Sequence, residues 1–323
     1  VILCHFCSSH VVAMEDPIPG TRIFVDFFCK PSGSAYVLTH AHTDHLKGLS
    51  AEWKHGLIHC SPITAALLVH RIGISPRILR THECEVPFEL LDPSSPSPIT
   101  VTFVDSNHCA GSIIVIFENL CDGPVVNTGD FRLCDTILRS PTLQRVALGA
   151  DGTRCQKLYV DASWANAPFY QIPSKAMSIE MCLHLLGSFQ TERWFIRSSL
   201  GDEELLKAIA LRFPGEKLLF TEEHRLREIQ IACPDLRESC ALLAPDELVD
   251  PDHCPRFVII KNWSARRDDR RLHNVHGVSV NWSTLWWARS QVDRVSQCGP
   301  KCDYYQTLWQ IVYSVHSSKQ EIE

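Results

Sequence analysis

The chain of 323 residues contains no apolar run that approaches the roughly 20 residues of a membrane-spanning helix. It also contains no internal repeat and no low-complexity tract. Its opening, VILCHFC, has neither the charged start nor the small-residue cleavage site of a signal peptide. The first residue is not methionine, so we expect the reading frame to begin further upstream. These absences predict a soluble globular protein that has no membrane helix.

The 15 cysteines are scattered along the chain without the spacing of a disulfide framework. Such a set is typical of reduced thiols in the cytosol or nucleus rather than of a secreted scaffold. Hydrophobic residues make up 45% of the chain and charged residues 21%, which is enough to bury a substantial core. The net charge of −6 does not indicate nucleic-acid binding, although a local basic groove can bind it on an acidic protein. Composition alone leaves the function open.

The stretch THAHTDHLKGLS, residues 39–50, places three histidines and an aspartate between His40 and His45. Imidazole and carboxylate ligands together favour Zn²⁺ or Mn²⁺ over Ca²⁺. The order H-x-H-x-D-H lets the first two histidines face one ion while Asp44 and His45 face a second. A two-metal hydrolytic centre also needs a bridging carboxylate and further histidines, for which Asp130, His108 and His316 are the candidates. A structural zinc site is disfavoured, because such sites are Cys-rich and four-coordinate whereas this set is larger and free of cysteine.

Several apolar segments in the first half end in a histidine or an aspartate, which predicts strands that lead into ligand loops. Side chains at such ends can converge at one edge of a sheet. These predicted strands lie within residues 21–28, 34–40, 98–118, 124–132 and 157–164. Residues 60–73 are predicted to form a helix, with Ser61 as its N-cap and Pro62 at its first position.

The pattern changes after about Asn166. Residues 202–213 and 221–232 are predicted to form amphipathic helices that begin at Asp202 and Thr221. Residues 256–262 and 278–287 are predicted strands, and 308–318 is a further apolar segment that ends in a histidine. We therefore expect a first domain over residues 1–165, an inserted α/β domain over 166–302, and a short return to the first domain over 303–323.

The motifs HAHTDH, SNHCAGS, TGDFR and YSVHSS together resemble those of the metallo-β-lactamase superfamily. More narrowly, they resemble the β-CASP DNA nucleases of the Artemis and Apollo type, and the resemblance covers nearly the whole chain. It implies an α/β fold, in which an αββα metallo-β-lactamase sandwich carries an inserted β-CASP α/β domain. It also implies a metal-dependent DNA exonuclease of the nucleus that acts from the 5′ end in interstrand cross-link or double-strand break repair.

The resemblance implies a role for each matching residue. The first metal would be bound by His40, His42 and His108, the second by Asp44, His45 and His316, with Asp130 as the bridge. Asp44, Asp26 and Asp161 would form the acidic catalytic group, in which Asp26 orients a ligand histidine. The implied cofactors are one or two Zn²⁺ ions, with Mn²⁺ or Mg²⁺ as alternatives at the second site. The implied partner is DNA, single-stranded or with a 5′ end.

The chain departs from the family pattern at three places. Ala110 stands where the family usually has proline, which changes the stiffness of the loop but removes no ligand. Residues 161–164 read DASW where DTTY is common, so contacts to DNA can differ. A β-CASP histidine is expected near residues 245–255, where Glu247 and His253 are the two candidates.

Different functions remain open on the sequence alone. The segments IPGTRIFVDFF, GLSAEWKHGLIHCS and NTGDFRLCD also resemble the nuclease-like module that precedes the ligase in a plant-type ATP-dependent DNA ligase. The chain could then be a catalytically weak DNA-binding module of a larger repair protein. An RNA-processing β-CASP nuclease and a small-molecule hydrolase are two further candidate functions. Asp161, taken without the family pattern, fits the cap of a turn at least as well as a catalytic role.

Overall fold

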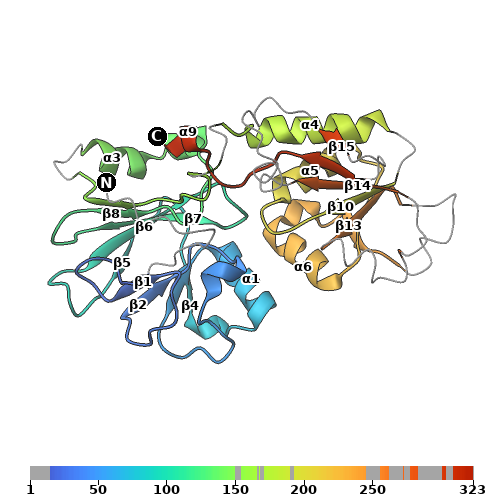
Figure 1. Cartoon of the computed structure of the whole chain (residues 1–323). Helices are drawn as coiled ribbons and strands as arrows, with labels where there is room; N and C mark the ends of the chain where they lie inside the picture. Colours follow the sequence, from blue (N-terminus) through green and yellow to red (C-terminus); the bar gives the residue numbers. More distant parts are fainter. Residues whose placement is uncertain are drawn as a thin grey trace. The chain divides into compact units, whose positions relative to one another are not determined.

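The computed structural model divides into two compact units, residues 1–163 and 164–323. It describes residues 15–149, 154–165, 167, 171–189, 193–244, 255–261, 272, 277–282, 300–302 and 308–322. Both units combine helices with sheets, which confirms the expected α/β class (Figure 1). Among the described helices, none is both long and apolar enough to cross a membrane.

The first unit contains two sheets. In one sheet all neighbours are parallel and the order is β1-β2-β3-β4. Its strands are β1 (Ile23–Val25), β2 (Ala35–Val37), β3 (Ile58–Cys60) and β4 (Leu79–Thr81). In the other sheet β5 to β8 are antiparallel neighbours, and β9 pairs with β8 in parallel. Its strands are β5 (Phe88–Leu90), β6 (Ile99–Asp105), β7 (Ile113–Glu118), β8 (Val125–Asn127) and β9 (Lys157–Tyr159).

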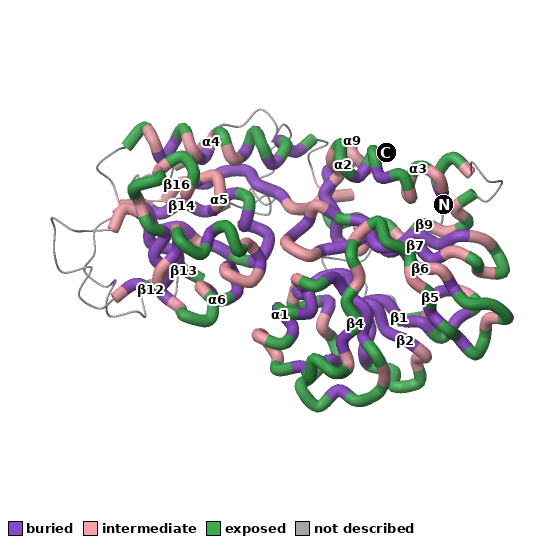
Figure 2. Tube along the Cα trace, turned by 180° about the vertical axis from the view of Figure 1, so that it is seen from behind, coloured by how far each residue is buried: buried purple, intermediate pink, exposed green. Residues whose placement is uncertain are grey.

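The two sheets pack face to face, and a helical layer covers each outer face. Side chains from β1 and β2 meet those from β6 and β7 in a shared core that includes Val37, Phe103 and Val115. The other face of the parallel sheet packs against helix α1 (Pro62–Ile72). The other face of the antiparallel sheet packs against α2 (Asp135–Leu138) and α3 (Pro141–Leu148). The order of layers is therefore helix, sheet, sheet, helix, and the buried strands stand out in Figure 2.

Helix α1 forms where its sequence signals predict it. Ser61 is the N-cap and accepts a hydrogen bond from the backbone N–H of Thr64, and Pro62 occupies the first helical position, where its missing N–H costs nothing. Gly73 ends the helix with a φ of +71°, and its N–H donates to Val69 O.

The strand directions bring the predicted ligand loops to a common edge within each sheet. Strands β1 and β2 are parallel, so the residues that follow them, Asp26 and His40, leave the same edge. Strands β6 and β8 are both antiparallel to β7 and so run in the same direction. The segments that follow them carry His108 and Asp130, and the segment after β9 carries Asp161.

The second unit is built on one sheet with the order β12-β11-β13-β10-β14-β16-β15, parallel except for β15. Its strands are β10 (Trp194–Arg197), β11 (Leu218–Phe220), β12 (Cys240–Leu242), β13 (Phe257–Ile260), β14 (Val278–Trp282), β15 (Lys301–Cys302) and β16 (Leu308–Ile311). Its helices are α4 (Lys175–Ser188), α5 (Glu203–Arg212), α6 (Glu223–Ala232) and α9 (Lys319–Ile322). Short 3₁₀ turns lie at η1 (Thr43–Leu46), η2 (Pro76–Ile78) and η3 (Pro234–Leu236) in the two units.

Two expected features of the second unit differ in detail or lie outside the described residues. The second amphipathic helix has Glu222, not Thr221, at its N-cap, because the Thr221 hydroxyl donates to Ile259 O and so ties the end of β11 to β13. Glu247 and His253, the candidates for the expected β-CASP histidine, lie outside the described residues. Because β16 pairs with β14, a return to the first domain would begin after Ile311, and the three-part domain division stays a prediction.

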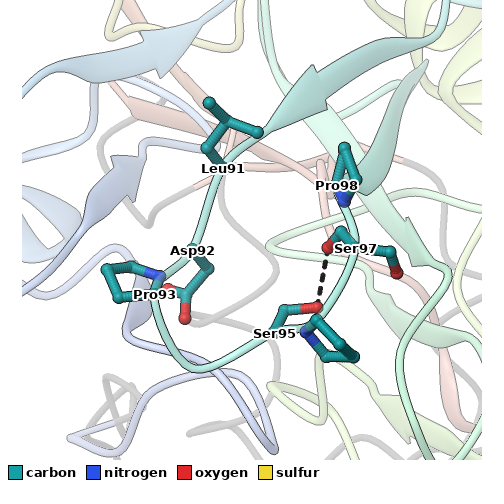
Figure 3. A pocket seen from close by; sticks show the side chains of 7 residues that line it. Leu91, Asp92, Pro93, Ser95, Ser97 and Pro98 are labelled. Carbon is teal, nitrogen blue, oxygen red and sulfur yellow. Dashed lines mark hydrogen bonds between the residues drawn. The ribbon is translucent and has the colours of Figure 1, made fainter.

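The loop between β5 and β6 encloses a small hollow at the end of β6 that is opposite to the His108 loop (Figure 3). Leu91, Asp92, Pro93, Ser95, Pro96, Ser97 and Pro98 line it. Asp92 is buried, and its carboxylate accepts hydrogen bonds from the backbone N–H groups of Arg22 and Ser94. Burial raises the pKa of Asp92, but the hydrogen bond from the Ser34 hydroxyl and these two backbone bonds outweigh it, so the pKa is lowered. The carboxylate thus fixes the base of the loop and takes no part in the ligand set.

A buried histidine pair in the first unit predicts a pH dependence of stability. His59 Nδ1 lies 2.9 Å from His82 Nε2, and both rings stack with Phe88. Burial, together with the charges of His82 and Arg80, lowers the pKa of His59 from 6.5 to about 4. Between these values the unfolded chain binds a proton that the folded chain does not bind, so stability falls as the pH drops from 6.5 to about 4.

We expect the free energy of unfolding, measured with denaturant at pH 7, 6 and 5, to fall with the pH. The variant His59→Gln should show a smaller dependence on pH. The matched control is His55→Gln, because His55 is exposed. Equal pH slopes in the wild type and His59→Gln would contradict the assignment of this effect to His59.

Candidate metal centre

The His40 loop begins directly after β2 and turns its imidazoles inward. His40 is fully buried, and its Nδ1 lies 3.0 Å from Thr39 Oγ1. Its other ring nitrogen, Nε2, lies 2.9 Å from Nδ1 of the half-buried His42. The two histidines of the H-x-H motif therefore direct their ring nitrogens toward one point.

The His108 loop follows β6 and brings a third imidazole to that point. His108 is fully buried, and its Nε2 lies 2.9 Å from His42 Nδ1. The loop is held by Ser112, whose hydroxyl accepts the backbone N–H groups of His108 and Cys109 and donates to Cys109 O. A histidine 66 positions away in sequence thus meets the H-x-H motif.

Asp130, which follows β8, adds a carboxylate to the three imidazoles. Its Oδ2 lies 3.7 Å from Nε2 of both His40 and His108. One ligand atom from each of His40, His42, His108 and Asp130 lies within 4.8 Å of every other. Ligand atoms about 2.0 to 2.1 Å from a tetrahedral zinc ion are roughly 3.3 Å apart, so the spacing fits one such ion after small shifts.

His45 is oriented by Asp26 and has one ring nitrogen left for a cation. Its Nδ1 lies 2.8 Å from Asp26 Oδ2, and the same carboxylate accepts the backbone N–H and the hydroxyl of Thr39. His45 Nε2 is buried and, within the described part of the chain, has no hydrogen-bond partner; it lies 3.4 Å from Asp130 Oδ2. Asp26 adopts a φ of +52°, which non-glycine residues seldom do.

The carboxylates around His45 favour a positive charge on its ring. Burial opposes a positive charge on this imidazole, but the carboxylates of Asp26 and Asp130 outweigh burial and raise its pKa to about 11. The carboxylates thus retain a proton on the histidine wherever nothing else supplies positive charge. A metal ion would supply that charge and could bind Nε2, which lies between the carboxylates of Asp44 and Asp130. The residues present therefore fit a divalent cation, whose identity the donor set leaves between zinc and its neighbours.

The other expected site residues lie at three different places. The Asp44 side chain is 54% exposed, and its Oδ2 lies 3.8 Å from His45 Nε2. Asp161 has a carboxylate oxygen within 4.8 Å of Asp130, while its Oδ1 accepts the N–H and hydroxyl of Ser163. Asp161 is therefore both a turn cap and a neighbour of the cluster. His316 lies in the second unit after β16, and its part in a second metal site stays a prediction.

Three buried residues that support the cluster had no signal in the sequence. Thr39 joins Asp26 to the His40 loop. The hydroxyl of Ser106 lies 2.8 Å from that of Ser112 and donates to Asp130 O at 2.9 Å, so it links the His108 loop to Asp130. Threonine and serine are common throughout the chain, and only their burial beside ligands distinguishes these three.

Comparisons with known proteins place the chain among DNA repair proteins. No family model matches the chain. The 5′ exonuclease Apollo of Gallus gallus is 37% identical over 312 residues, which are 94% of this chain and 59% of that protein. The DNA cross-link repair protein SNM1 of Arabidopsis thaliana is 36% identical over 321 residues, 94% of this chain and 61% of that protein. The chain thus spans about three fifths of these two relatives.

Two further similarities are more distant. DNA ligase 6 of Arabidopsis thaliana is 29% identical over 242 residues, which are 66% of this chain and 16% of the ligase. A crystal structure of a protein of unknown function from Enterococcus faecalis aligns with a TM-score of 0.53 at 11% identity, over 88% of this chain and 70% of that one, and so shares the fold alone. The identities to Apollo, SNM1 and mouse Artemis, at 33% over 325 residues for the last, decide the assignment. The chain belongs to the Artemis, Apollo and SNM1 nuclease family.

Proposed function

We propose that the chain is a metal-dependent DNA nuclease that hydrolyses phosphodiesters from the 5′ end in the repair of DNA. The observation that carries the proposal is the convergence of His40, His42, His108 and Asp130, beside which the buried His45 Nε2 has no hydrogen-bond partner among the described residues. Histidine and aspartate donors without cysteine, on loops that follow strands, are typical of catalytic rather than structural metal sites. The names of the relatives supply the substrate class.

Each residue then has a defined part. His40, His42 and His108 would hold a first cation, Asp130 would bridge, and Asp44 and His45, with His316, would hold a second. Bound cations of this kind supply hydroxide at neutral pH and stabilise negative charge on the phosphodiester. Asp26 fixes the ring of His45 through Nδ1, so that Nε2 would be the nitrogen that binds a cation. Asp161, beside Asp130, would add negative charge that helps to retain the second cation.

The finer assignments follow from the same proposal. The helix–sheet–sheet–helix order of the first unit supports a metallo-β-lactamase sandwich, and the parallel sheet of the second unit supports an inserted β-CASP domain. Zinc is the proposed ion at the first site, with zinc, Mn²⁺ or Mg²⁺ at the second. We propose a nuclear location, because DNA repair nucleases act there.

The test is digestion of single-stranded DNA by metal-depleted and metal-restored protein. Oligonucleotides with a 5′-phosphate and with a 5′-hydroxyl are compared with an RNA of matched sequence. We expect no cleavage after depletion, recovery with zinc or manganese, and faster cleavage of the 5′-phosphorylated DNA than of the RNA.

Asp44→Asn, prepared in parallel, is the control for a contaminating nuclease and should lose most of the activity. Equal digestion by the wild type and Asp44→Asn would assign the cleavage to a contaminant. A preference for RNA would replace the proposal by an RNA-processing function. Metal binding without cleavage of any strand would support a silent DNA-binding module.

A further inference from the structure

We propose that helix α1 braces the metal centre, because its first turn holds the His108 loop and its last turn holds the loop between His40 and His42. Ser61, Thr64 and Arg71 are then positioning residues, which act on cation affinity through the ligand loops. The inference rests on the proposed function, since it concerns the same cation site.

The N-cap and the first turn of α1 form hydrogen bonds to the carbonyl oxygen of Gly111. Ser61 Oγ donates to Gly111 O at 2.6 Å, and Thr64 Oγ1 donates to the same oxygen at 2.9 Å. Both side chains are buried, Thr64 completely. Two hydroxyl donors on one buried carbonyl leave that carbonyl little freedom to move, since each lost bond would leave a buried polar group unsatisfied.

Gly111 itself shows how closely the loop approaches the helix. Its φ is +80°, and a Cβ at this position would lie 2.8 Å from Ile63 Cβ and from Ser61 Oγ, and 3.0 Å from Thr64 N. The loop therefore packs on the first turn of α1 with no room for a side chain. Gly111 is three residues from His108, and the Ser112 hydroxyl ties both ends of this turn together, so the hold on Gly111 reaches the ligand.

The last turn of α1 holds the other loop. Arg71 donates from Nη1 to Ala41 O, and Ala41 is the buried residue between His40 and His42. The carbonyl thus fixed belongs to the peptide bond between Ala41 and the ligand residue His42. An arginine suits this role because its long stem spans from the helix to the loop and its planar group sets the direction of the donor.

One rigid element therefore spans both ligand loops. Helix α1 has 11 residues, a length of about 16 Å at 1.5 Å per residue. His42 Nδ1 lies 2.9 Å from both His40 Nε2 and His108 Nε2, so a small relative shift of the loops would separate atoms that must bind one ion. The contacts with α1 therefore add to the hold that Ser112 already has on the His108 loop.

The test measures Zn²⁺ binding by the metal-depleted protein in competition with a chromophoric chelator, with no DNA present. Thr64→Val removes a donor to Gly111 O without changing the size of the side chain. Arg71→Met removes the donor to Ala41 O and keeps most of the side-chain stem. We expect each to weaken zinc binding by about tenfold, the lower end of the effect of residues that support metal ligands. Thr64→Ser, which keeps the hydroxyl, should restore most of the affinity.

A matched pair separates positioning from stability. Ser61 and Ser140 both precede a proline, and both accept the N–H three residues on at 3.2 Å. Ser61 holds the His108 loop, whereas Ser140 caps α3 and donates to Glu85. Ser61→Ala and Ser140→Ala should both lower Tm, and only Ser61→Ala should weaken zinc binding.

The outcomes distinguish the two proposals. A wild type that fails to bind zinc would overturn the proposed function. A wild type that binds zinc, together with Thr64→Val and Arg71→Met that bind it equally well, would overturn the brace alone. Equal losses of zinc affinity in Ser61→Ala and Ser140→Ala would also overturn it, because the lower stability of both variants would then account for the weaker binding.

Discussion

Asp130→Asn is expected to lower the rate of DNA cleavage by at least about a thousandfold, in the range seen when a central catalytic group is removed. The Asp130 carboxylate lies 3.4 to 3.7 Å from ring nitrogens of His40, His45 and His108, and it is the one anion central to all three within the described part of the chain. Asparagine keeps the size and one oxygen but removes the negative charge. In its proposed role as the bridge between two cations Asp130 would need that charge, so both metal retention and the hydrolytic step should suffer.

The measurement is the initial rate on 5′-phosphorylated single-stranded DNA, together with the bound metal per chain. Asp135→Asn is the matched control, because the Asp135 side chain is 82% exposed and forms a salt bridge with Arg139 across one helical turn. It should change neither the rate nor the metal content. Full activity in Asp130→Asn at unchanged metal content would remove Asp130 from the reaction.

Gly129→Ala is expected to destabilise the protein by about 2 to 4 kcal/mol, through backbone strain and overpacking together. Gly129 has a φ of +50°, a conformation that disfavours any side chain. Its Cβ would lie 2.9 Å from Cβ and Cγ2 of Thr39. Thr39 is fully buried, bound to Asp26, and accepts the N–H of Ile113, so it cannot retreat without moving His40.

Gly20→Ala isolates the contribution of the contact. Gly20 has a φ of +73°, but nothing lies within 4 Å of a Cβ built there, so only the backbone strain remains, about 1 kcal/mol. Denaturant unfolding of the metal-depleted proteins gives both values. Equal losses of stability in Gly129→Ala and Gly20→Ala would show that Thr39 can move aside without a large loss of stability. Gly129→Ala should also bind zinc more weakly, whereas Gly20→Ala should not.

Local signals in the sequence predicted part of the fold well. Ser61 and Pro62 begin α1 as predicted, and Asp202 begins the helix α5. The helix α4 and the strands β10 and β11 were not predicted from the sequence. Helix α4 buries residues such as Cys182 and Leu186, but its apolar residues are too evenly distributed around the helix for a clear helical period. Strand β11 has only three residues, all buried, which periodicity cannot separate from a piece of helix.

The sequence also identified residues of the candidate metal centre, because ligand chemistry is a property of single residues. His40, His42, His108 and Asp130 were predicted to meet, and the structure brings them within 4.8 Å of each other. The sequence could not show which groups hold these four residues in place. Thr39, Ser106, Ser112 and Arg71 carry ordinary side chains, and their role arises from burial and direction.

By itself, then, the sequence determined which histidines and aspartates could bind a metal and where the helix α1 begins, since each depends on residue chemistry or on neighbours within a few positions. Only the tertiary structure decided that His45 keeps one buried nitrogen without a hydrogen-bond partner among the described residues, that Gly111 and Gly129 leave no room for a side chain, and that α1 spans both ligand loops. These features depend on distances between segments far apart in the sequence, such as those of Thr39 and Gly129. Such distances are set by the packing of two sheets and their helices, which no local pattern encodes.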